Sequence, residues 1–292
     1  MGPIAESELI LDKRGAIYHI GARPEEMADT IILVGDPDRV PVVSKHFDEV
    51  EFRLQHREFI THTGRIGQKR ISVVSTGIGP DNIDIAMNEL DALANIDLDT
   101  RMIREEKKSL RIFRFGTSGS LQADIPVDSY VAGSFGLGFD NVMHFYNEPN
   151  TAVEREIIAA FKQHTSLTTG NVLPYIYEGD HTLLKHFRDG YHQGITVGCP
   201  GFYGPQGRVL RLGLAYEGLI DKLTSFRYQD HRISNFEMES SAIYGLGKAL
   251  GHHCLSLNVI VANRVVKQFS ADGGKAVEGL IKQSLERISS LD

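Results

Sequence analysis

Apolar and amphipathic stretches alternate along the chain, which is the pattern of an α/β protein. Short apolar runs that end in glycine or another turn former are typical of buried strands. On this basis we expect strands at residues 30–35, 52–63, 70–76, 110–115, 129–133, 195–198 and 254–262. Longer stretches carry apolar residues near a helical period, as at Ile83, Met87 and Leu90. These stretches predict helices at residues 39–47, 81–95, 152–164, 179–189, 239–250 and 274–288.

The order of these elements predicts one α/β domain. Strands and helices alternate through most of the 292 residues, which favours a mixed or parallel sheet with helices on both faces. The sequence contains no internal repeat, low-complexity tract or obvious linker, so we assign residues 1–292 to a single domain. The charged segment 97–108 is interpreted as a surface insertion or as an extension of the preceding helix.

The composition narrows the class of protein. Hydrophobic residues make up 41% and charged residues 24% of the chain, which is ordinary for a soluble globular protein. A net charge of -7 argues against nucleic acid or an anionic membrane as the main partner. Cys199 and Cys254 lie far apart, which predicts neither a disulfide framework nor a zinc site. Because the N-terminus lacks a secretory signal and no apolar run is long enough to span a membrane, we expect a cytoplasmic protein.

Two acids flank a methionine at residues 237–239, where a strand-like stretch meets a predicted helix. Burying both charges would be costly unless they are paired or bind a ligand. A carboxylate such as that of Glu239 can accept two hydrogen bonds from a vicinal diol, and Met238 offers an apolar surface for a ring. The alternative is a solvated helix start, at which acids are favoured by the helix dipole. The segment alone does not separate a sugar site from a plain helix start.

Three predicted strands lead into glycine-bearing segments, at residues 35–39, 76–80 and 116–119. In open α/β sheets ligands bind beyond the carboxyl ends of the strands, and glycine lets backbone N–H groups approach an anion. None of these segments matches the phosphate-binding loop of nucleotide hydrolases or the dinucleotide fingerprint. Glycine after a strand is also ordinary turn chemistry, so each segment alone is weak evidence of a ligand site.

The arginines strengthen the case for an anion site. Arg39 follows the first glycine segment, and Arg114 lies between Phe113 and Phe115 in a predicted strand, two residues before Gly116. Because side chains alternate along a strand, Arg114 points away from both phenylalanines. A guanidinium in that position suits bidentate contact with an oxyanion, and a salt bridge to a nearby acid is the alternative.

The chain contains eight short motifs, at residues 18–21 (YHIG), 35–40 (GDPDRV), 56–59 (HREF), 75–79 (STGIG), 114–119 (RFGTSG), 202–208 (FYGPQGR), 237–240 (EMES) and 263–264 (NR). They occur in the order found in the nucleoside phosphorylase family, which includes uridine phosphorylase. Each motif is weak alone, but together the collinear motifs cover most of the chain. The chain therefore resembles this family. The resemblance implies an α/β/α sandwich with a central mixed, partly barrel-like sheet.

The resemblance also implies a role for particular residues. Those that would hold inorganic phosphate are Gly35, Arg39, Arg114 and Thr117, with Arg57 reaching the phosphate of a neighbouring subunit. Those that would bind ribose are Met238 and Glu239, with His19 reaching across the same interface. Those on the base side would be Phe202, Gln206, Arg208 and Glu237, of which Glu237 is either a base contact or a structural partner. The residues expected to act directly in catalysis are Arg39, Arg114, Thr117 and Arg208.

The implied reaction is phosphorolysis of uridine to uracil and ribose 1-phosphate. The sugar acquires positive charge as the glycosidic bond breaks, and a phosphate held beneath it both stabilises that charge and attacks, so no protein nucleophile is needed. Arg208 and the Gln206 amide would stabilise the leaving uracil. No cofactor is implied, since phosphate is a co-substrate. Glu58 and Ser75 resemble positions that bind a monovalent cation such as K⁺ at the interface of some homo-oligomers in this family, which are dimers or hexamers of dimers.

Other nucleosides remain as alternatives. In the purine branch of this fold an aspartate after the penultimate strand protonates the base, and the corresponding stretch 261–265 (VANRV) has no aspartate. This absence and the pair Gln206 and Arg208 favour a pyrimidine. A phosphorylase of purine or thymidine-like nucleosides is the second hypothesis, and a nucleosidase or a non-catalytic nucleoside-binding protein is the third. The chain has 12 histidines, but they show no metal-ligand spacing, so we do not expect metal catalysis.

Overall fold

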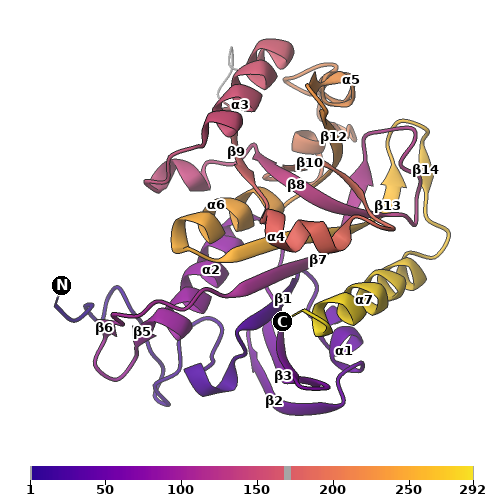
Figure 1. Ribbon diagram of the computed structural model, residues 1–292. Coiled ribbons are helices and arrows are strands. Elements are labelled where there is room, and N and C mark those ends of the chain that lie inside the picture. Colours follow the sequence, from indigo (N-terminus) through magenta and orange to yellow (C-terminus); the bar gives the residue numbers. More distant parts are fainter. Residues whose placement is uncertain (1, 168–171, 292) are drawn as a thin grey trace.

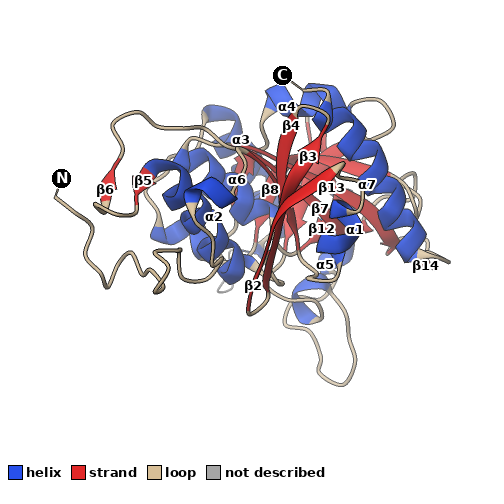
Figure 2. Cartoon of the chain, turned by 90° about the horizontal axis from the view of Figure 1, so that it is seen from below, coloured by secondary structure: helices blue, strands red, loops and turns tan. Residues whose placement is uncertain are grey.

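The computed structural model describes residues 2–167 and 172–291 (Figure 1). Helices cover both faces of one large mixed sheet, and the same layers are visible from below in Figure 2. The strands of this sheet are β1 (Thr30–Val34), β2 (Glu49–His56), β3 (Phe59–Ile66), β4 (Lys69–Ser75), β7 (Arg111–Ser120), β8 (Tyr130–Gly138), β9 (Tyr175–Glu178), β10 (His192–Gly198), β11 (Arg227–Tyr228), β12 (His231–Glu237), β13 (His253–Asn263) and β14 (Gln268–Phe269). The α-helices are α1 (Arg39–Ser44), α2 (Pro80–Asn95), α3 (Ala152–Thr165), α4 (His181–Leu184), α5 (Leu219–Ser225), α6 (Ser240–Leu250) and α7 (Gly273–Ser289).

Five of these strands close into a barrel. β7 pairs with β13, β13 with β8, β8 with β10 and β10 with β12, and β12 returns to pair with β7. The closing contact is short and antiparallel, with Asn235 opposite Ser120 and Phe236 opposite Gly119. β1 to β4 continue the sheet outward from β7. The α/β class and the partly barrel-like mixed sheet are therefore confirmed.

The apolar side chains of β1 explain why helices lie on both faces. Ile31 and Leu33 join a core cluster that includes residues of α2 and α6, whereas Ile32 and Val34 join a cluster that includes residues of α1 and α7. All five residues of β1 are buried, as expected for a strand between two layers of helices. The carboxyl end of this buried strand leads directly to Gly35.

The structure corrects two strand predictions. The segment 52–63 is not one strand, because β2 and β3 form an antiparallel hairpin whose turn lies at Arg57 and Glu58. The strand predicted at 110–115 does not end before Gly116 but continues as β7 to Ser120. Gly116 is therefore not a turn residue, and its role is given by the site described below.

Other predictions differ mainly in extent. The helices predicted at 81–95, 152–164, 239–250 and 274–288 match α2, α3, α6 and α7 within one or two residues. The segment 97–108 does not extend α2, because that helix ends at Asn95 and is followed by the small hairpin of β5 (Ile96–Asp97) and β6 (Met102–Ile103). The helix predicted at 179–189 is only α4 followed by a 3₁₀ turn. Within the described residues no helix is long and apolar enough to cross a membrane.

Candidate active site

A cavity of about 640 Å³ lies at the carboxyl ends of β1 and β7 and beside the start of α6. It brings together most of the side chains and turns that the sequence singled out. The predicted site residues that line it are Gly35, Arg39, Arg114, Thr117, Phe202, Gln206, Arg208, Glu237, Met238 and Glu239. These residues come from four separate segments of the chain and meet in one cavity, as expected at the carboxyl edge of an α/β sheet.

Arg114 is the most constrained charged group of the cavity. Its side chain is buried, and its guanidinium forms ion pairs with Glu239 and, at 3.3 Å, with Glu237. Burial alone would lower the pKa of Arg114, but the negative charges of Glu239 and Glu237 raise it above its usual value. A Cβ atom on Gly116 would lie 1.5 Å from Nη1 of Arg114. Gly116 is therefore needed because the arginine side chain folds over the backbone at that position.

Glu239 is held from two sides at the residue just before α6. Its Oε1 atom accepts a hydrogen bond from the backbone N–H of Gly79 at 2.9 Å, and its Oε2 atom accepts one from Nη2 of Arg114. Gly79 has φ 105°, a conformation that favours glycine. The glycine segment after β4 therefore serves to orient a carboxylate.

Glu237 caps the start of α6. Its carboxylate accepts the backbone N–H groups of Glu239 and Ser240, each at 3.0 Å. The side chain is buried, and burial raises the pKa of Glu237 to about 7, an effect that Arg114 opposes and the neighbouring charge of Glu239 reinforces. Of the two roles that the sequence left open for Glu237, its bonds support the structural one, although it also lines the cavity.

This pKa predicts how stability depends on pH. The folded state keeps the Glu237 proton up to about pH 7, whereas an exposed glutamate loses it near 4.5. The group therefore stabilises the fold fully below pH 4.5, and this contribution is lost as pH rises through about 7. Relative to Glu237→Gln, the wild type should lose roughly 2–3 kcal/mol of unfolding free energy between about pH 5 and pH 8.

Urea unfolding of both proteins across this range is the measurement. The control is Glu286→Gln, which changes an exposed glutamate of α7 and should follow the wild type. Parallel curves for the wild type and Glu237→Gln would contradict a raised pKa.

Arg39 and Arg114 place two cations at the same end of the cavity. Arg39 donates a hydrogen bond to the carbonyl oxygen of Phe115 at 3.2 Å, and burial together with the positive charge of Arg114 lowers the pKa of Arg39. Two neighbouring guanidinium groups repel each other unless an anion lies between or beside them. Thr117 and the backbone at Gly35 line the same region. This end of the cavity is suited to an oxyanion with several acceptor oxygens.

The other end of the cavity is formed by the loop that carries Phe202, Gln206 and Arg208. The Arg208 guanidinium lies 3.7 Å from the centre of the Phe202 ring and donates to the Phe202 carbonyl oxygen at 2.6 Å and to Oε1 of Gln206 at 2.5 Å. Gln206 is buried, and Phe202 is half exposed. Burial and the nearby positive charge of Arg264 lower the pKa of Arg208. This end offers a flat apolar surface beside amide and guanidinium donors.

Three residues of the site were not assigned a role from the sequence. Arg264 donates to the backbone oxygen of Gln206 at 3.1 Å and so holds the loop. Phe236 forms part of the cavity wall, and Asn258 binds Arg114. Arg264 belongs to the motif at residues 263–264, so the sequence does draw attention to it. Phe236 and Asn258 lie in buried strands and look like ordinary core positions in the sequence.

Of the residues predicted to bind phosphate or ribose, Arg57 and His19 do not line the cavity. Arg57 is exposed at the turn between β2 and β3, where its Nη2 atom donates to the Tyr18 hydroxyl at 3.2 Å. The Nδ1 atom of His19 lies 2.6 Å from Oε1 of Glu89 on α2. These residues form one surface cluster, since His56 also lies 3.1 Å from the His19 carbonyl oxygen.

Glu58 and Ser75 lie close together, as a shared site would require. The Ser75 hydroxyl donates to the backbone oxygen of Glu58 at 2.5 Å and accepts the backbone N–H of Ile60 at 2.7 Å. These bonds tie β4 to the β2–β3 hairpin. The Ser75 hydroxyl is fully buried and already takes part in these hydrogen bonds. A cation there would therefore depend mainly on the Glu58 carboxylate and on groups from outside this chain. A monovalent-cation site at these residues stays a prediction.

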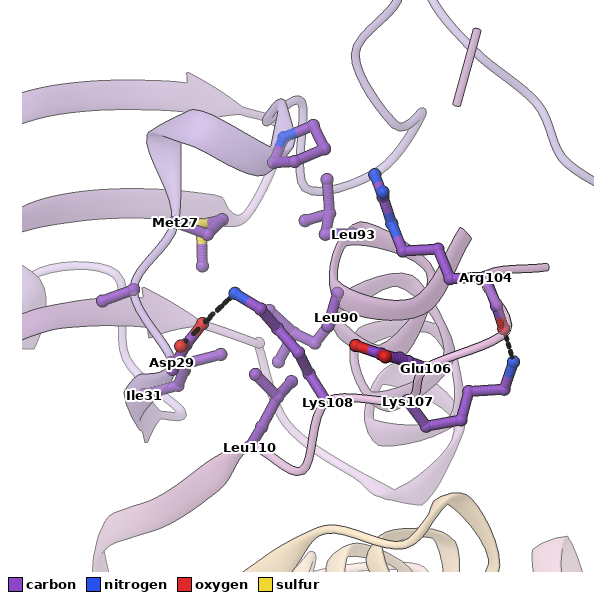
Figure 3. A pocket seen from close by; sticks show the side chains of 13 residues that line it. Met27, Asp29, Ile31, Leu90, Leu93, Arg104, Glu106, Lys107, Lys108 and Leu110 are labelled. Atoms are coloured by element: carbon purple, nitrogen blue, oxygen red, sulfur yellow. Dashed lines mark hydrogen bonds and ion pairs between the residues drawn. The ribbon is translucent and has the colours of Figure 1, made fainter. Parts of the chain in front are cut away.

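Another cavity, of about 530 Å³, lies away from the predicted site residues (Figure 3). Its floor is apolar and includes Leu90 and Leu110, and its rim is charged. Lys108 points toward Asp29, with Nζ 3.3 Å from the carboxylate, and both side chains are largely exposed. Exposed pairs of this kind are weak in water. The residues that line this second cavity include neither the paired arginines nor the buried carboxylates described above.

Comparison with known proteins agrees with this geometry. The family model described as Phosphorylase superfamily matches residues 29–286. The uridine phosphorylase of Thermococcus kodakarensis is 29% identical over 283 residues, which cover 96% of this chain and 89% of the relative. A purine nucleoside phosphorylase of Listeria welshimeri is 25% identical over 241 residues, or 82% of this chain and 84% of that protein. A solved Trypanosoma brucei nucleoside phosphorylase, described as showing uridine phosphorylase activity, superposes with a TM-score of 0.89 at 28% identity and covers 97% of this chain and 100% of its own.

Proposed function

The chain belongs to the phosphorylase superfamily, and from that premise we propose that it is a uridine phosphorylase. It would cleave the N-glycosidic bond of uridine with inorganic phosphate and release uracil and ribose 1-phosphate. One observation carries this proposal: a single cavity joins the guanidinium groups of Arg39 and Arg114 to the Gln206 and Arg208 pair, with Glu239 in the same cavity. The name of the Thermococcus relative and the activity stated for the Trypanosoma enzyme support the choice of uridine.

Phosphate would bind at the end with two arginines. Arg39 and Arg114 supply charged donors, the Thr117 hydroxyl supplies a further one, and Gly35 lets the backbone come close. Phosphate bound at this end would lie on one side of the sugar. Its negative charge would stabilise the positive charge that develops on the sugar as the glycosidic bond breaks. Its oxygen then attacks the anomeric carbon, and the bond to the base breaks. Positioning and charge, rather than a protein nucleophile, would drive the step.

Ribose would bind between the phosphate and the base. Each oxygen of the Glu239 carboxylate already accepts one protein hydrogen bond, and each retains a lone pair for a ribose hydroxyl. The Met238 side chain lines the cavity beside it and can pack on the sugar ring. Because Glu239 and Arg114 are bonded to each other, sugar binding and phosphate binding would be linked through one ion pair.

Uracil would lie beside Phe202, with its oxygens toward Gln206 and Arg208. The Gln206 carbonyl oxygen accepts a bond from Arg208, and within the described residues the Gln206 NH₂ group donates to no protein acceptor. Gln206 lines the cavity, so this NH₂ group is available to a ligand that supplies an acceptor, and a ligand without one would leave the donor unpaired. As the bond to the base breaks, negative charge grows on the uracil oxygens, and the Arg208 cation would stabilise it.

The direct test is incubation with uridine in the presence and absence of phosphate. Uracil and ribose 1-phosphate should form together, at a rate that depends on phosphate and falls to background without it. Equal release of uracil in phosphate-free buffer would show a nucleosidase instead. Binding of uridine without turnover in saturating phosphate would favour a non-catalytic binding protein.

A phosphorylase for purine nucleosides is the second candidate, since a purine nucleoside phosphorylase is among the relatives. The stretch at which the purine branch has its aspartate contributes Val261 and Ala262 to the cavity wall. Asn263 is buried outside the cavity lining, and its side chain donates to the carbonyl oxygens of Gln122 and Ile125. This stretch contains no carboxylic acid that could protonate a purine. Faster cleavage of inosine than of uridine would overturn the assignment to pyrimidines.

We also propose that the protein is a homo-oligomer in which neighbouring subunits share active sites, without choosing between a dimer and a hexamer of dimers. Arg57 and His19 lie outside their own subunit's cavity, on an ordered surface cluster, where they could complete the site of a neighbour. K⁺ bound near Glu58 and Ser75 would belong to the same interface. The free, buried thiols of Cys199 and Cys254 support the cytoplasm as the compartment.

A further inference from the structure

We propose that Asn258 is a positioning residue for phosphorolysis, because it fixes the guanidinium plane of Arg114 toward phosphate. This inference rests on the proposed function and concerns a buried amide in the barrel wall that the resemblance does not assign. Oδ1 of Asn258 accepts a hydrogen bond from Nη1 of Arg114 at 2.8 Å. The bond is fully enclosed by protein, since Asn258 has no exposed surface and Arg114 is 6% exposed.

The sheet places Asn258 beside Arg114 through Gly116. Asn258 on β13 pairs in register with Gly116 on β7, two residues beyond Arg114 and on the same face. A Cβ atom on Gly116 would lie 2.4 Å from Oδ1 of Asn258 and 1.5 Å from Nη1 of Arg114. The missing side chain therefore creates the space in which the amide and the guanidinium meet.

The Asn258 amide is itself held in one orientation. Its Nδ2 atom donates to Oγ of Ser256 at 3.1 Å, and Oγ of Ser240 donates to the same Ser256 oxygen at 2.7 Å. Ser240 is the first residue of α6 and follows Glu239 directly. A chain of buried polar groups therefore connects Arg114 to the helix start that carries the proposed ribose ligand.

A neutral partner is what this position requires. Glu239 and Glu237 both attract the Nη2 edge of Arg114. With nothing on Nη1, the guanidinium could turn and pair bidentately with these carboxylates, which would neutralise the cation that phosphate needs. An amide oxygen holds the second edge without adding negative charge. Asn258 thus orients the cation and leaves its charge available for phosphate.

The test is steady-state kinetics of Asn258→Ala with uridine and phosphate varied in turn. Because Asn258→Ala removes a hydrogen bond to the charged Arg114 side chain, the KM for phosphate should rise roughly tenfold or more, while the KM for uridine changes by less than about threefold. Ser256→Ala removes the acceptor that holds the Asn258 amide, and it also removes the partner of the Ser240 hydroxyl. It should show the same selectivity with a smaller rise of about two- to fivefold. Gly116→Ala places a Cβ atom where Nη1 of Arg114 and Oδ1 of Asn258 meet, so it displaces both side chains and should raise the KM for phosphate at least as much as Asn258→Ala.

Asn95→Ala is the matched control. Asn95 is also a buried asparagine whose amide is bonded through both of its polar atoms, since it donates to Asp91 and to the Lys108 carbonyl oxygen and accepts the Lys108 backbone N–H. It lies at the end of α2 and does not line the cavity. It should lower thermal stability and leave both KM values unchanged. Equal rises in the two KM values of Asn258→Ala, or a selective rise in Asn95→Ala, would overturn the inference. If the wild type itself does not need phosphate, the proposed function fails, which is a different result.

Discussion

Replacing Arg114 by alanine is expected to lower the kcat/KM for phosphate by about a thousandfold, the upper end of what loss of one preorganised charged donor costs. The guanidinium is buried, so no water can replace its charge at the moment when the glycosidic bond breaks. Arg39 would remain, but without Arg114 the phosphate loses one of the two arginines that line the same subunit's cavity. Initial rates of uracil release at varied phosphate concentration measure the effect.

The same substitution should also destabilise the fold. Removing Arg114 leaves Glu239 and Glu237 close together, buried and without their cation, which costs roughly 3–5 kcal/mol near neutral pH. The loss should shrink in acid, because protonation removes the unpaired charges. Urea unfolding at about pH 5 and about pH 8 separates this effect from catalysis.

Two companion variants separate charge from geometry. Arg114→Lys keeps the charge, but one ammonium group cannot hold Asn258 and Glu239 on two edges, so stability should largely return while most of the activity does not. The double variant Arg114→Ala with Glu239→Gln removes one of the stranded charges and should recover stability with no recovery of turnover. Arg114→Ala that retains more than about a tenth of wild-type activity would contradict the role of Arg114 in phosphate binding.

How far the sequence predicts this site can be judged from Gly116. A glycine after an apolar run usually marks a turn, and the local pattern predicts one here. The structure instead continues the strand, because the glycine provides space for the side chain of Arg114 two residues earlier and for Asn258 on the next strand. That reason depends on Asn258, which lies far along the chain from Gly116, and no local pattern contains it.

The turn at Arg57 was missed for the opposite reason. The hairpin between β2 and β3 turns at a non-glycine residue with φ 54°, so no glycine, proline or asparagine marks it. The polar–apolar alternation runs on across the turn and reads as one strand. The barrel closure was implied only by the family resemblance, since the pairing of β12 with β7 joins residues more than a hundred positions apart.

The acids at 237 and 239 show what spacing can and cannot decide. The sequence correctly predicted a strand-to-helix junction with both carboxylates beside one cavity. Which acid caps the helix depends on where the first turn begins, and helix boundaries are uncertain by one or two residues from sequence. Glu237 bonds to the N–H groups at the helix start, and this leaves Glu239 for Arg114 and the proposed sugar.

Mixing two inactive variants should restore activity if active sites are shared between subunits. Arg57→Ala should by itself lower the kcat/KM for phosphate by roughly 10- to 100-fold, the cost of a lost charged hydrogen bond, although Arg57 does not line its own cavity. In a mixed dimer of Arg57→Ala and Arg114→Ala, the first subunit keeps Arg114 and receives Arg57 from its partner. One of the two sites is then complete. Random reassociation makes about half of the dimers mixed, so recovery should reach about a quarter of wild-type activity.

The control is a mixture of two variants whose changes lie in the same subunit's cavity. Arg39 and Arg114 line the same subunit's cavity, so a mixture of Arg39→Ala and Arg114→Ala leaves every site defective and should recover nothing. Two different affinity tags isolate the mixed oligomers, in which half of the sites are complete, so their uracil release should reach about half of that of the wild type and is compared with that of each parent. Arg57 is already ordered for such a contact, because its guanidinium lies 5.4 Å from the centre of the Tyr18 ring and bonds to the Tyr18 hydroxyl. Verified mixed oligomers with no recovered activity would mean that each subunit builds its phosphate site alone, and Arg57 would then be only a surface turn residue.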